Sequence, residues 1–505
     1  MLFNSYLFVF IFLPICLLGY YFAVNKRNGN YAKIWLIAMS LWFYGSVRIE
    51  YLLILFGSVL FNYAVWRTFF SKEKEKTKRD KMFLVFGITG NLALLVYVKY
   101  MNFFMESINN LMQGNLPLLK VLLPLGISFF TFQQISFLID CYKGEIKECS
   151  FGDYVLYITY FPKLIEGPIV MHSEMLPQFQ TIAEKTMDAE RIAKGICLFV
   201  LGMGKKVILA DTFGSAVNYG YSNLGTMHAS DAVLLILFYA LQLYFDFSGY
   251  CDMGRGISWM FGLELPVNFN SPYKARNIVD FWKRWHITLN RFFTKYIYIP
   301  LGGNRVGSFK MYRNLFVVFF LSGLWHGAGW NFILWGMLHG VLYVITRMWQ
   351  KRQNMKSTIS GIDGGKERVT LKPVTGLFVI LTFLYVSAAW VFFRADSVAQ
   401  GVELFRLIGN HEFVRINKNL AGCFNLDEFW YAIKILGLDA WEYGHYILMT
   451  VMTIFSLAVV FFSKNAAQLA EKMKTKLWPA ILLSTLFLWC VLTFSKVSTF
   501  LYFNF

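Results

Sequence analysis

The residue in this sequence most suited to catalysis is His326, which stands between Trp325 and Gly327 in the stretch LSGLWHGAGWNFILWG (321–336). The stretch lies inside an apolar run, 315–345. An ionisable side chain within a membrane segment is costly and is a functional candidate by default. A neutral imidazole accepts a proton near pH 7, as a general base must. The alternative interpretation is a buried histidine that hydrogen-bonds two helices together.

A second polar cluster, KARNIVDFWKRWHITLNRFF, covers residues 274–293. We predict that His286 in this cluster is a second polar active-site residue. Lys283 and Arg284 are the basic residues nearest to it, and we predict that they bind the phosphates of a donor at the entrance of the site. The alternative is an interfacial amphipathic helix whose basic side chains extend to the lipid headgroups.

Three further residues are candidates for donor binding. Asp246, in YFDFSGYCDMGRG, is either a channel residue or a carboxylate that links helices, and the second role is favoured because buried carboxylates need partners. Trp325 and Asn331 flank the site of His326. His339 follows His326 by 13 residues, about 220° around a helix, and we therefore interpret it as structural.

The composition indicates a membrane protein, since 57% of the 505 residues are hydrophobic and 15% are charged. Apolar runs of about 18 residues or more, long enough to cross ~30 Å of hydrocarbon, recur along the chain. The chain carries a net charge of +18. Its basic residues lie in short loops between the apolar runs, where they attract anionic lipid and orient the chain in the membrane. The charge therefore does not indicate nucleic-acid binding. The predicted spans are 2–24, 33–47, 50–68, 83–105, 119–140, 193–210, 231–250, 375–393, 447–463 and 477–495.

Basic loops favour the cytoplasmic side, and this rule predicts that both chain ends lie outside. The 314–346 run would then enter and return on the same side. Each arm is predicted to be roughly 20–27 Å long, too short to cross fully. Gly323, Gly327 and Gly329 permit a bend between the arms, which would leave His326 near the midplane. Lys205 and Lys206 conflict with this orientation, because they fall near the outer end of a span.

Several motifs are absent. The sequence has no P-loop, no H-E-x-x-H and no G-x-S-x-G pattern, and its seven cysteines include no C-x-x-C pair. We predict no metal ligands and no bound cofactor.

With these residues in view, the chain resembles the membrane-bound O-acyltransferase family, in its alginate and peptidoglycan O-acetyltransferase branch. The resemblance covers essentially the whole chain. It rests on the segments PLGISFFTFQQISFLIDCYKGEI (124–146), YFPKLIEGPIV (160–170), YFDFSGYCDMGRGISWMFGLELPVNFNSPY (244–273), DFWKRWHITLNRFFTKYIYIPLGGNR (280–305) and SGLWHGAGWNFILWGMLHG (322–340).

The resemblance implies an all-α polytopic fold, a ring of about 10–11 transmembrane helices around a thin core with re-entrant or broken helices and a central funnel and tunnel. It implies that His326 is the family's near-invariant catalytic histidine and that His286 is the second, more variable polar position. It also implies that the acyl group comes from a cytosolic thioester and is delivered outside.

The chain ends in SKVSTFLYFNF (495–505). The tail resembles the end motif of the acetyltransferase branch, in which a tyrosine is thought to hold the acyl group transiently, and Tyr502 is the matching position. The alternative is an aromatic anchor at the outer interface. Because the chain lacks a serine-hydrolase motif, the resemblance implies a separate extracytoplasmic O-acetyltransferase of the SGNH-hydrolase type as partner.

We therefore predict a single integral membrane domain, 1–505, ending in a tail motif at 500–505, in a bacterial plasma (inner) membrane. It would move acetyl from acetyl-CoA towards hydroxyls of peptidoglycan or another envelope or exported polysaccharide. Two alternatives stay open: D-alanyl transfer to teichoic acid from a carrier-protein thioester, and a polytopic transporter without chemistry.

Overall fold

The computed structural model describes residues 1–505 apart from 27–28, 71–76, 147, 360–371, 438–440, 442, 475, 496–500 and 502–505. Within the described residues the secondary structure is entirely helical. The chain forms two compact units. The first unit comprises residues 1–203, 249–267 and 466–504, and the second comprises residues 204–248, 268–465 and 505.

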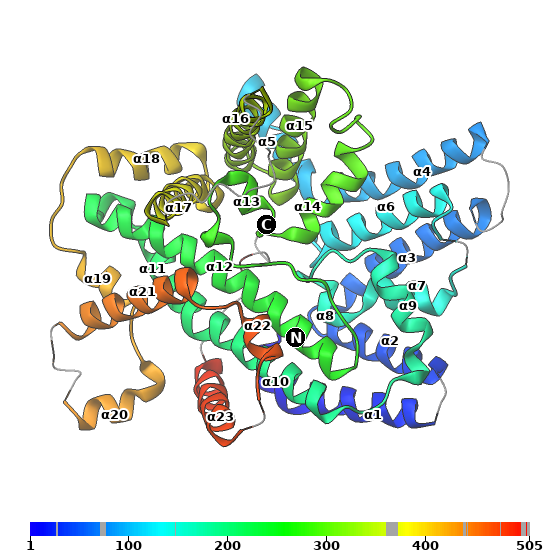
Figure 1. Ribbon diagram of the computed structural model, residues 1–505, viewed down its shortest axis with the longest axis horizontal. Coiled ribbons are helices and arrows are strands. Elements are labelled where there is room, and N and C mark those ends of the chain that lie inside the picture. The colour runs from blue at the N-terminus through cyan, green and yellow to red at the C-terminus, as the bar shows by residue number, and fades with distance from the viewer. Residues whose placement is uncertain are drawn as a thin grey trace. The chain divides into compact units, whose positions relative to one another are not determined.

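The first unit contains the N-terminal helices and the last two helices of the chain (Figure 1). Its main packing pairs are α1 with α2, α4 with α6, and α2 with α7. The π-helix η1 runs into α1, and η2 joins α4 to α5 without a break. Its helices are η1 (Phe8–Phe12), α1 (Leu13–Asn25), α2 (Gly29–Gly45), α3 (Ile49–Phe69), α4 (Lys78–Leu95), η2 (Val96–Tyr100), α5 (Met101–Met112), α6 (Ile127–Lys143), α7 (Phe151–Thr159), α8 (Phe161–Leu164), α9 (His172–Gln180), η3 (Ile182–Glu184), α10 (Ala189–Gly204), α22 (Ala466–Glu471), α23 (Leu477–Leu492) and η10 (Thr493–Ser495).

Helix α6 corrects one predicted span. The sequence predicts a span over 119–140, but the helix begins at Ile127, after Pro124 and Gly126, whose φ is +72°. Proline and a left-handed glycine both favour a turn over a continuous helix. Every residue from Ile127 to Leu138 is buried. This apolar stretch is therefore a core element of the first unit rather than a lipid-facing span.

The second unit contains the two predicted active-site histidines. The boundary between the units falls within α12 (Ala229–Met260), between Ser248 and Gly249. The other helices of this unit are η4 (Lys205–Ala210), α11 (Asp211–Ser222), η5 (Leu224–Thr226), η6 (Pro272–Lys274), α13 (Ile278–Trp282), α14 (Ile287–Phe293), η7 (Thr294–Tyr298), α15 (Ser308–His326), α16 (Trp330–Ile359), α17 (Lys372–Arg394), α18 (Val398–Gly409), α19 (Lys418–Gly422), η8 (Asp427–Phe429), α20 (Trp430–Ile435) and α21 (Gly444–Phe462).

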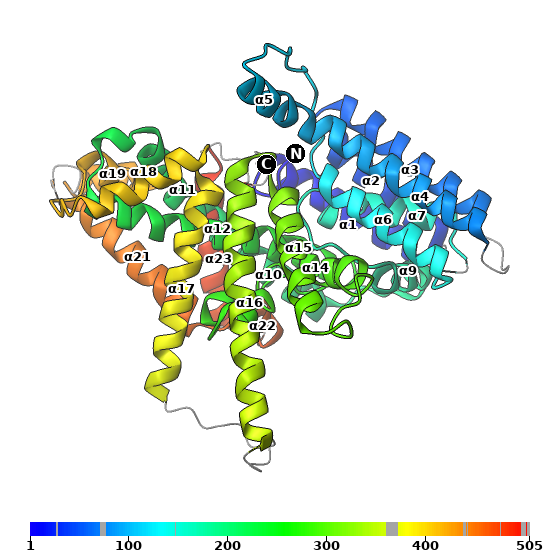
Figure 2. The same cartoon turned by 90° about the horizontal axis from the view of Figure 1, so that it is seen from above.

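Helices α15 and α16 form a tight hairpin, which Figure 2 shows as two adjacent helices. The predicted break is present, since α15 ends at His326 and α16 begins at Trp330. The predicted arm lengths are wrong for α16, because this helix continues to Ile359, and its segment Trp330–Gln353 is long and apolar enough to span a membrane. Apolar runs alone underestimated the helix, since its polar C-terminal turns are helical as well.

The glycines of the hairpin provide space rather than unusual backbone angles. Gly323 lies within α15, where an added Cβ would stand 2.5 Å from the Phe332 carbonyl oxygen. At Gly336 of α16, a Cβ would stand 2.5 Å from the Phe319 carbonyl oxygen. Gly327 has extended backbone, with φ −160°, yet a Cβ there would stand 2.2 Å from the Phe332 ring. The glycines therefore allow the two helices to approach closely.

Among the described residues, eight helical segments are long and apolar enough to cross a membrane. Seven coincide with predicted spans, and the eighth is Trp330–Gln353 in α16. The predicted spans at 33–47, 119–140 and 193–210 also form helices, but these do not meet the same criteria of length and hydropathy. The chain is thus an all-α polytopic membrane protein, and the ring of helices with its central funnel stays a prediction.

Lys206, which conflicts with the orientation predicted from the basic loops, is a buried and paired charge. Lys206 is 1% exposed, and its Nζ lies 2.6 Å from Asp246 Oδ1 and 2.8 Å from Asp211 Oδ1. Burial lowers the pKa of Lys206, but the carboxylates of Asp246 and Asp211 outweigh that effect and raise it. Lys206 therefore joins η4 to α12 as part of an ion-pair network, and is not a loop charge that orients the chain.

Candidate functional site

His326 is the last residue of α15 and is 2% exposed. Its ring lies among aromatic side chains, with centroid distances of 4.8 Å to Trp325, 5.0 Å to Trp335 and 5.2 Å to Phe393. The break after α15 fixes this position, because the helix stops and the chain turns back directly beyond the imidazole. The site is thus a buried histidine at a helix end, in a mostly apolar environment.

His286 comes from a different part of the chain and lies beside the same site. Its ring centroid is 6.4 Å from that of His326 and 6.0 Å from that of Trp325. His286 is fully buried, and burial lowers its pKa to about 3. It stands at the N-cap of α14 in a left-handed conformation, with φ +44° and ψ +52°. Such a conformation is uncommon and costly for a residue other than glycine, which makes its surroundings informative.

The other predicted site residues divide into two groups. Trp325 packs against both histidines and is 4% exposed. Asp246, Arg284 and Asn331 are held by contacts elsewhere. Asp246 pairs with Lys206, and Arg284 Nε lies 2.8 Å from Asp280 Oδ1. Asn331 Nδ2 donates to the carbonyls of Ala395 and Phe392, which ties the start of α16 to the end of α17.

A cavity of about 160 Å³ opens in the second unit between α14, η7, α15 and α16. It contains Ser322, one helical turn before His326, and Arg347, which supplies the only basic side chain of its lining. Neither Lys283, which is exposed, nor Arg284 lines it. The sequence analysis did not single out Arg347, because its position in the cavity depends on how α14, η7, α15 and α16 pack. The remaining lining residues are Trp282, Leu289, Asn290, Phe293, Thr294, Tyr298, Asn304, Leu315, Val318, Phe319 and Tyr343.

His339 lies apart from the two histidines, as predicted. Trp335 stands between them, since its ring centroid is 5.0 Å from that of His326 and also 5.0 Å from that of His339. His339 is fully buried, and in the described part of the chain neither of its ring nitrogens makes a hydrogen bond. Its surroundings are aromatic, including Trp282 at 5.3 Å between ring centroids. These contacts fit a packing role.

Tyr502, the predicted acyl carrier, lies outside the described residues. The residue directly before it, Leu501, is described, and the last helical element upstream is η10, which ends at Ser495.

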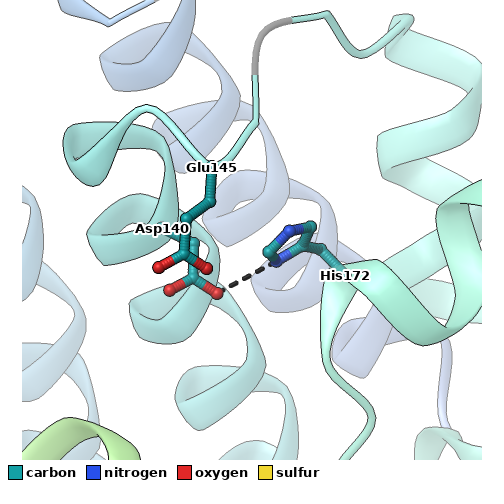
Figure 3. A group of neighbouring side chains, drawn as sticks. All are labelled: Asp140, Glu145 and His172. Atoms are coloured by element: carbon teal, nitrogen blue, oxygen red, sulfur yellow. Dashed lines mark hydrogen bonds and ion pairs between the residues drawn. The ribbon is translucent and has the colours of Figure 1, made fainter.

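The first unit contains a separate cluster of Asp140, Glu145 and His172, which sequence reasoning did not single out (Figure 3). One potential metal-ligating atom from each residue lies within 4.8 Å of the others. His172 Nδ1 is 2.9 Å from Asp140 Oδ2. This interaction joins the C-terminal turn of α6 to the first residue of α9, so the cluster has a structural explanation.

Comparison with known proteins supports the same family as the motifs. The family model of the membrane-bound O-acyltransferases matches residues 80–360, which include both His286 and His326. The chain is 40% identical to the peptidoglycan O-acetyltransferase of Helicobacter pylori over 432 residues, which cover 80% of this chain and 79% of that protein.

Two further relatives extend the comparison. A probable alginate O-acetylase AlgI of Pseudomonas aeruginosa is 35% identical, with 84% of this chain and 78% of that protein covered. A teichoic acid D-alanyltransferase of Streptococcus thermophilus is 25% identical, over 76% of this chain and 93% of that protein. With its buried histidine at a broken helix inside the matched region, this chain belongs to the membrane-bound O-acyltransferase family and is an O-acyltransferase.

Proposed function

We propose that this enzyme takes acetyl from cytosolic acetyl-CoA and passes it across a bacterial plasma membrane towards hydroxyls of peptidoglycan or another envelope polysaccharide. The observation that carries the proposal is the pairing of His326 and His286, from separate helices, at 6.4 Å between ring centroids in one buried aromatic environment. The acceptor class follows from relatives that are named for O-acetylation of peptidoglycan and alginate.

In the proposed reaction, His326 is the general base. A phenol has a pKa near 10 and is mostly protonated at pH 7, so its oxygen needs a base to become nucleophilic. His326 takes the phenol proton of Tyr502, and the phenolate oxygen attacks the thioester carbonyl. The C–S bond breaks, and the departing thiolate takes the proton from the imidazolium to give free CoA thiol. The products are an acetyl-tyrosine ester and neutral His326.

The cavity beside α16 is the proposed donor entrance. Arg347 follows Trp335 by 12 residues, about 18 Å along the helix, and the Trp335 ring contacts His326. A guanidinium suits a phosphate group, while the thioester end would have to reach His326. Ser322 of the same cavity is one turn from the histidine. These positions support Arg347 as a phosphate-binding residue, in addition to the sequence-predicted Lys283 and Arg284.

The proposed carrier, Tyr502, follows Ser495 by seven residues. An extended segment of that length reaches at most ~25 Å, whereas the midplane lies about half of ~30 Å below the membrane surface. The tail is thus long enough for the phenol to reach a histidine at that depth. A separate extracytoplasmic transferase of the SGNH-hydrolase type would then move the acetyl group to the polysaccharide.

We also propose how the enzyme is arranged in the membrane. Residues 1–505 act as one enzyme domain that ends in the 500–505 tail motif. Both chain ends lie outside, and the segments 71–81 and 347–373 lie in the cytoplasm, because each carries more Lys and Arg than Asp and Glu.

The second candidate is D-alanyl transfer to teichoic acid, which the 25% identical relative favours. Membership of an acyltransferase family argues against the transporter alternative. Release of free thiol by the purified protein distinguishes the donors. Acetyl-CoA should be consumed by the wild type and left intact by His326→Ala. Turnover of a D-alanyl carrier-protein thioester, with acetyl-CoA left intact, would overturn the acetyl assignment.

A further inference from the structure

Asn268 lies directly beside His286, in the loop that follows α12. It is 2% exposed. Its side-chain Oδ1 lies 3.2 Å from His286 Nδ1, 3.2 Å from the Thr288 backbone nitrogen and 2.9 Å from Thr288 Oγ1. Its backbone carbonyl accepts a hydrogen bond from the backbone N–H of Ile287 at 3.0 Å. One asparagine therefore binds three consecutive residues at the start of α14.

These contacts determine which end of the Asn268 amide faces His286. A backbone N–H can only donate, so the Asn268 atom that meets the Thr288 nitrogen must be the carbonyl oxygen and not the amide nitrogen. An amide oxygen only accepts hydrogen bonds. His286 Nδ1, which meets the same oxygen, must therefore carry a proton.

The proton on Nδ1 fixes the form of the imidazole. A neutral imidazole carries one proton, on one of its two nitrogens. Burial lowers the pKa of His286 to about 3, so the ring is neutral at physiological pH. With Nδ1 protonated, Nε2 holds the lone pair.

We infer that Asn268 is a positioning residue, which holds His286 as the Nδ1–H tautomer so that Nε2 accepts a hydrogen bond from the hydroxyl that receives the acyl group. This inference rests on the function proposed above. His286 would orient the acceptor hydroxyl while His326 takes its proton, which gives the two histidines different tasks. The left-handed backbone of His286 fits this role, because the contacts of Asn268 hold a conformation that the residue would otherwise avoid.

The groups around His286 allow a test by pH. The rings that face it come from α12 (Phe247), the loop of Asn268 (Phe269) and α15 (Trp325 and His326), and His326 is the titratable one among them. Asn268→Asp keeps an oxygen acceptor in place and adds a negative charge that favours the imidazolium. Above about pH 7 this variant should keep most of its activity. Towards pH 5 it should lose activity much more steeply than the wild type, since a protonated Nε2 cannot accept a hydrogen bond.

Asn268→Ala removes the acceptor. It should lower kcat for thiol release from acetyl-CoA by about 10²-fold, the lower end of the range for a lost proton-transfer group, while KM for acetyl-CoA stays nearly unchanged. Thr288→Val is the matched control. It removes a hydroxyl that binds the same Asn268 oxygen but leaves the His286 contact intact, so its kcat and pH profile should stay close to those of the wild type.

The outcomes separate the alternatives. If Asn268→Ala loses activity while Asn268→Asp keeps both wild-type kcat and the wild-type pH profile, Asn268 is only a structural clamp and the inference fails. If Thr288→Val lowers kcat as much as Asn268→Ala does, the loop contacts and not the tautomer matter, and the inference also fails. If Asn268→Ala does not fold, the pH profile of Asn268→Asp decides alone. His326→Ala, assayed in parallel, tests the proposed function separately, because full activity of this variant contradicts the role of His326 as base whatever the Asn268 variants do.

Discussion

The rings of His286 and His326 lie 6.4 Å apart, centroid to centroid, although 40 positions separate them in the sequence. Neither helix brings them together by itself. His326 ends α15, His286 precedes α14, and the Trp325 ring contacts both imidazoles. The pair places two buried imidazoles beside each other, and we propose that one orients a hydroxyl while the other deprotonates it.

Loss of the proposed base should abolish transfer. We expect His326→Ala to lower the rate of thiol release from acetyl-CoA by ~10²–10⁴-fold, the usual contribution of a general base, with little change in thermal stability. The matched control is His339→Phe, which keeps an aromatic ring and removes no hydrogen bond that the described structure contains. A purified His326→Ala enzyme with wild-type turnover would rule out the assigned role.

Charge reversal at Arg347 should weaken donor binding. We expect Arg347→Glu to raise KM for acetyl-CoA at least tenfold and to change kcat little, the signature of lost uniform binding. Lys283→Glu reverses the charge at the exposed lysine predicted from sequence, which does not line the cavity, and shows whether this lysine also contributes to donor binding. If Lys283→Glu raises KM and Arg347→Glu does not, the donor enters by the route predicted from sequence alone.

Removal of the Tyr502 phenol oxygen should show whether this residue is an acyl carrier or only an aromatic anchor at the membrane interface. Tyr502→Phe keeps the ring and its interfacial packing, so the protein should fold normally but should not acetylate polymer. Wild-type protein incubated with acetyl-CoA without its partner should gain one acetyl group on the C-terminal peptide, measured by mass spectrometry. Polymer acetylation by Tyr502→Phe at the wild-type rate would mean that transfer bypasses the tyrosine.

Removal of one partner of the buried ion pair between Lys206 and Asp246 should destabilise the folded protein. Lys206→Met takes away the cation 2.6 Å from Asp246, a carboxylate that is 1% exposed. Loss of one partner of such a pair costs about 3–5 kcal/mol, so the midpoint of thermal unfolding in detergent should fall clearly. The double variant Lys206→Met/Asp246→Leu should recover most of that loss. Equal stability of wild type and Lys206→Met would show that the pair contributes nothing.

Stability should rise with pH because of Lys163. This side chain is fully buried in α8, its Nζ donates to Gln133 Oε1 at 2.8 Å, and burial lowers its pKa from the ordinary 10.5 to about 7. Between pH 7 and 10.5 the unfolded chain binds the proton and the folded chain does not, so stability increases with pH across this window and is flat below it. The total effect is on the order of a few kcal/mol. Lys163→Met should flatten the rise of the unfolding midpoint between pH 7 and 10, whereas an unchanged slope would assign it to other groups.

The sequence by itself determined the features that depend on residues close together along the chain. Apolar runs predicted the helices, because a segment that crosses hydrocarbon must be long and apolar. The stretch from Trp325 to Trp330 predicted the break at His326, and α15 and α16 meet there. The motifs around His286 and His326 identified the family. The local reason for the break was wrong, however, since Gly327 is needed for its contact with Phe332 and not for a special backbone angle.

Only the tertiary structure decided which distant groups meet. Hydropathy does not reveal that α6 is buried over most of its length, because a core helix and a lipid-facing helix have similar composition. Loop-charge counting found only that Lys206 conflicts with the predicted orientation, and could not show that it pairs with Asp246, 40 residues away. The contact of Asn268 with His286 likewise joins a loop to a helix start 18 residues later. Hydrogen bonds and ion pairs of this kind depend on distances below about 4 Å between side chains, and only the packing of the helices sets those distances.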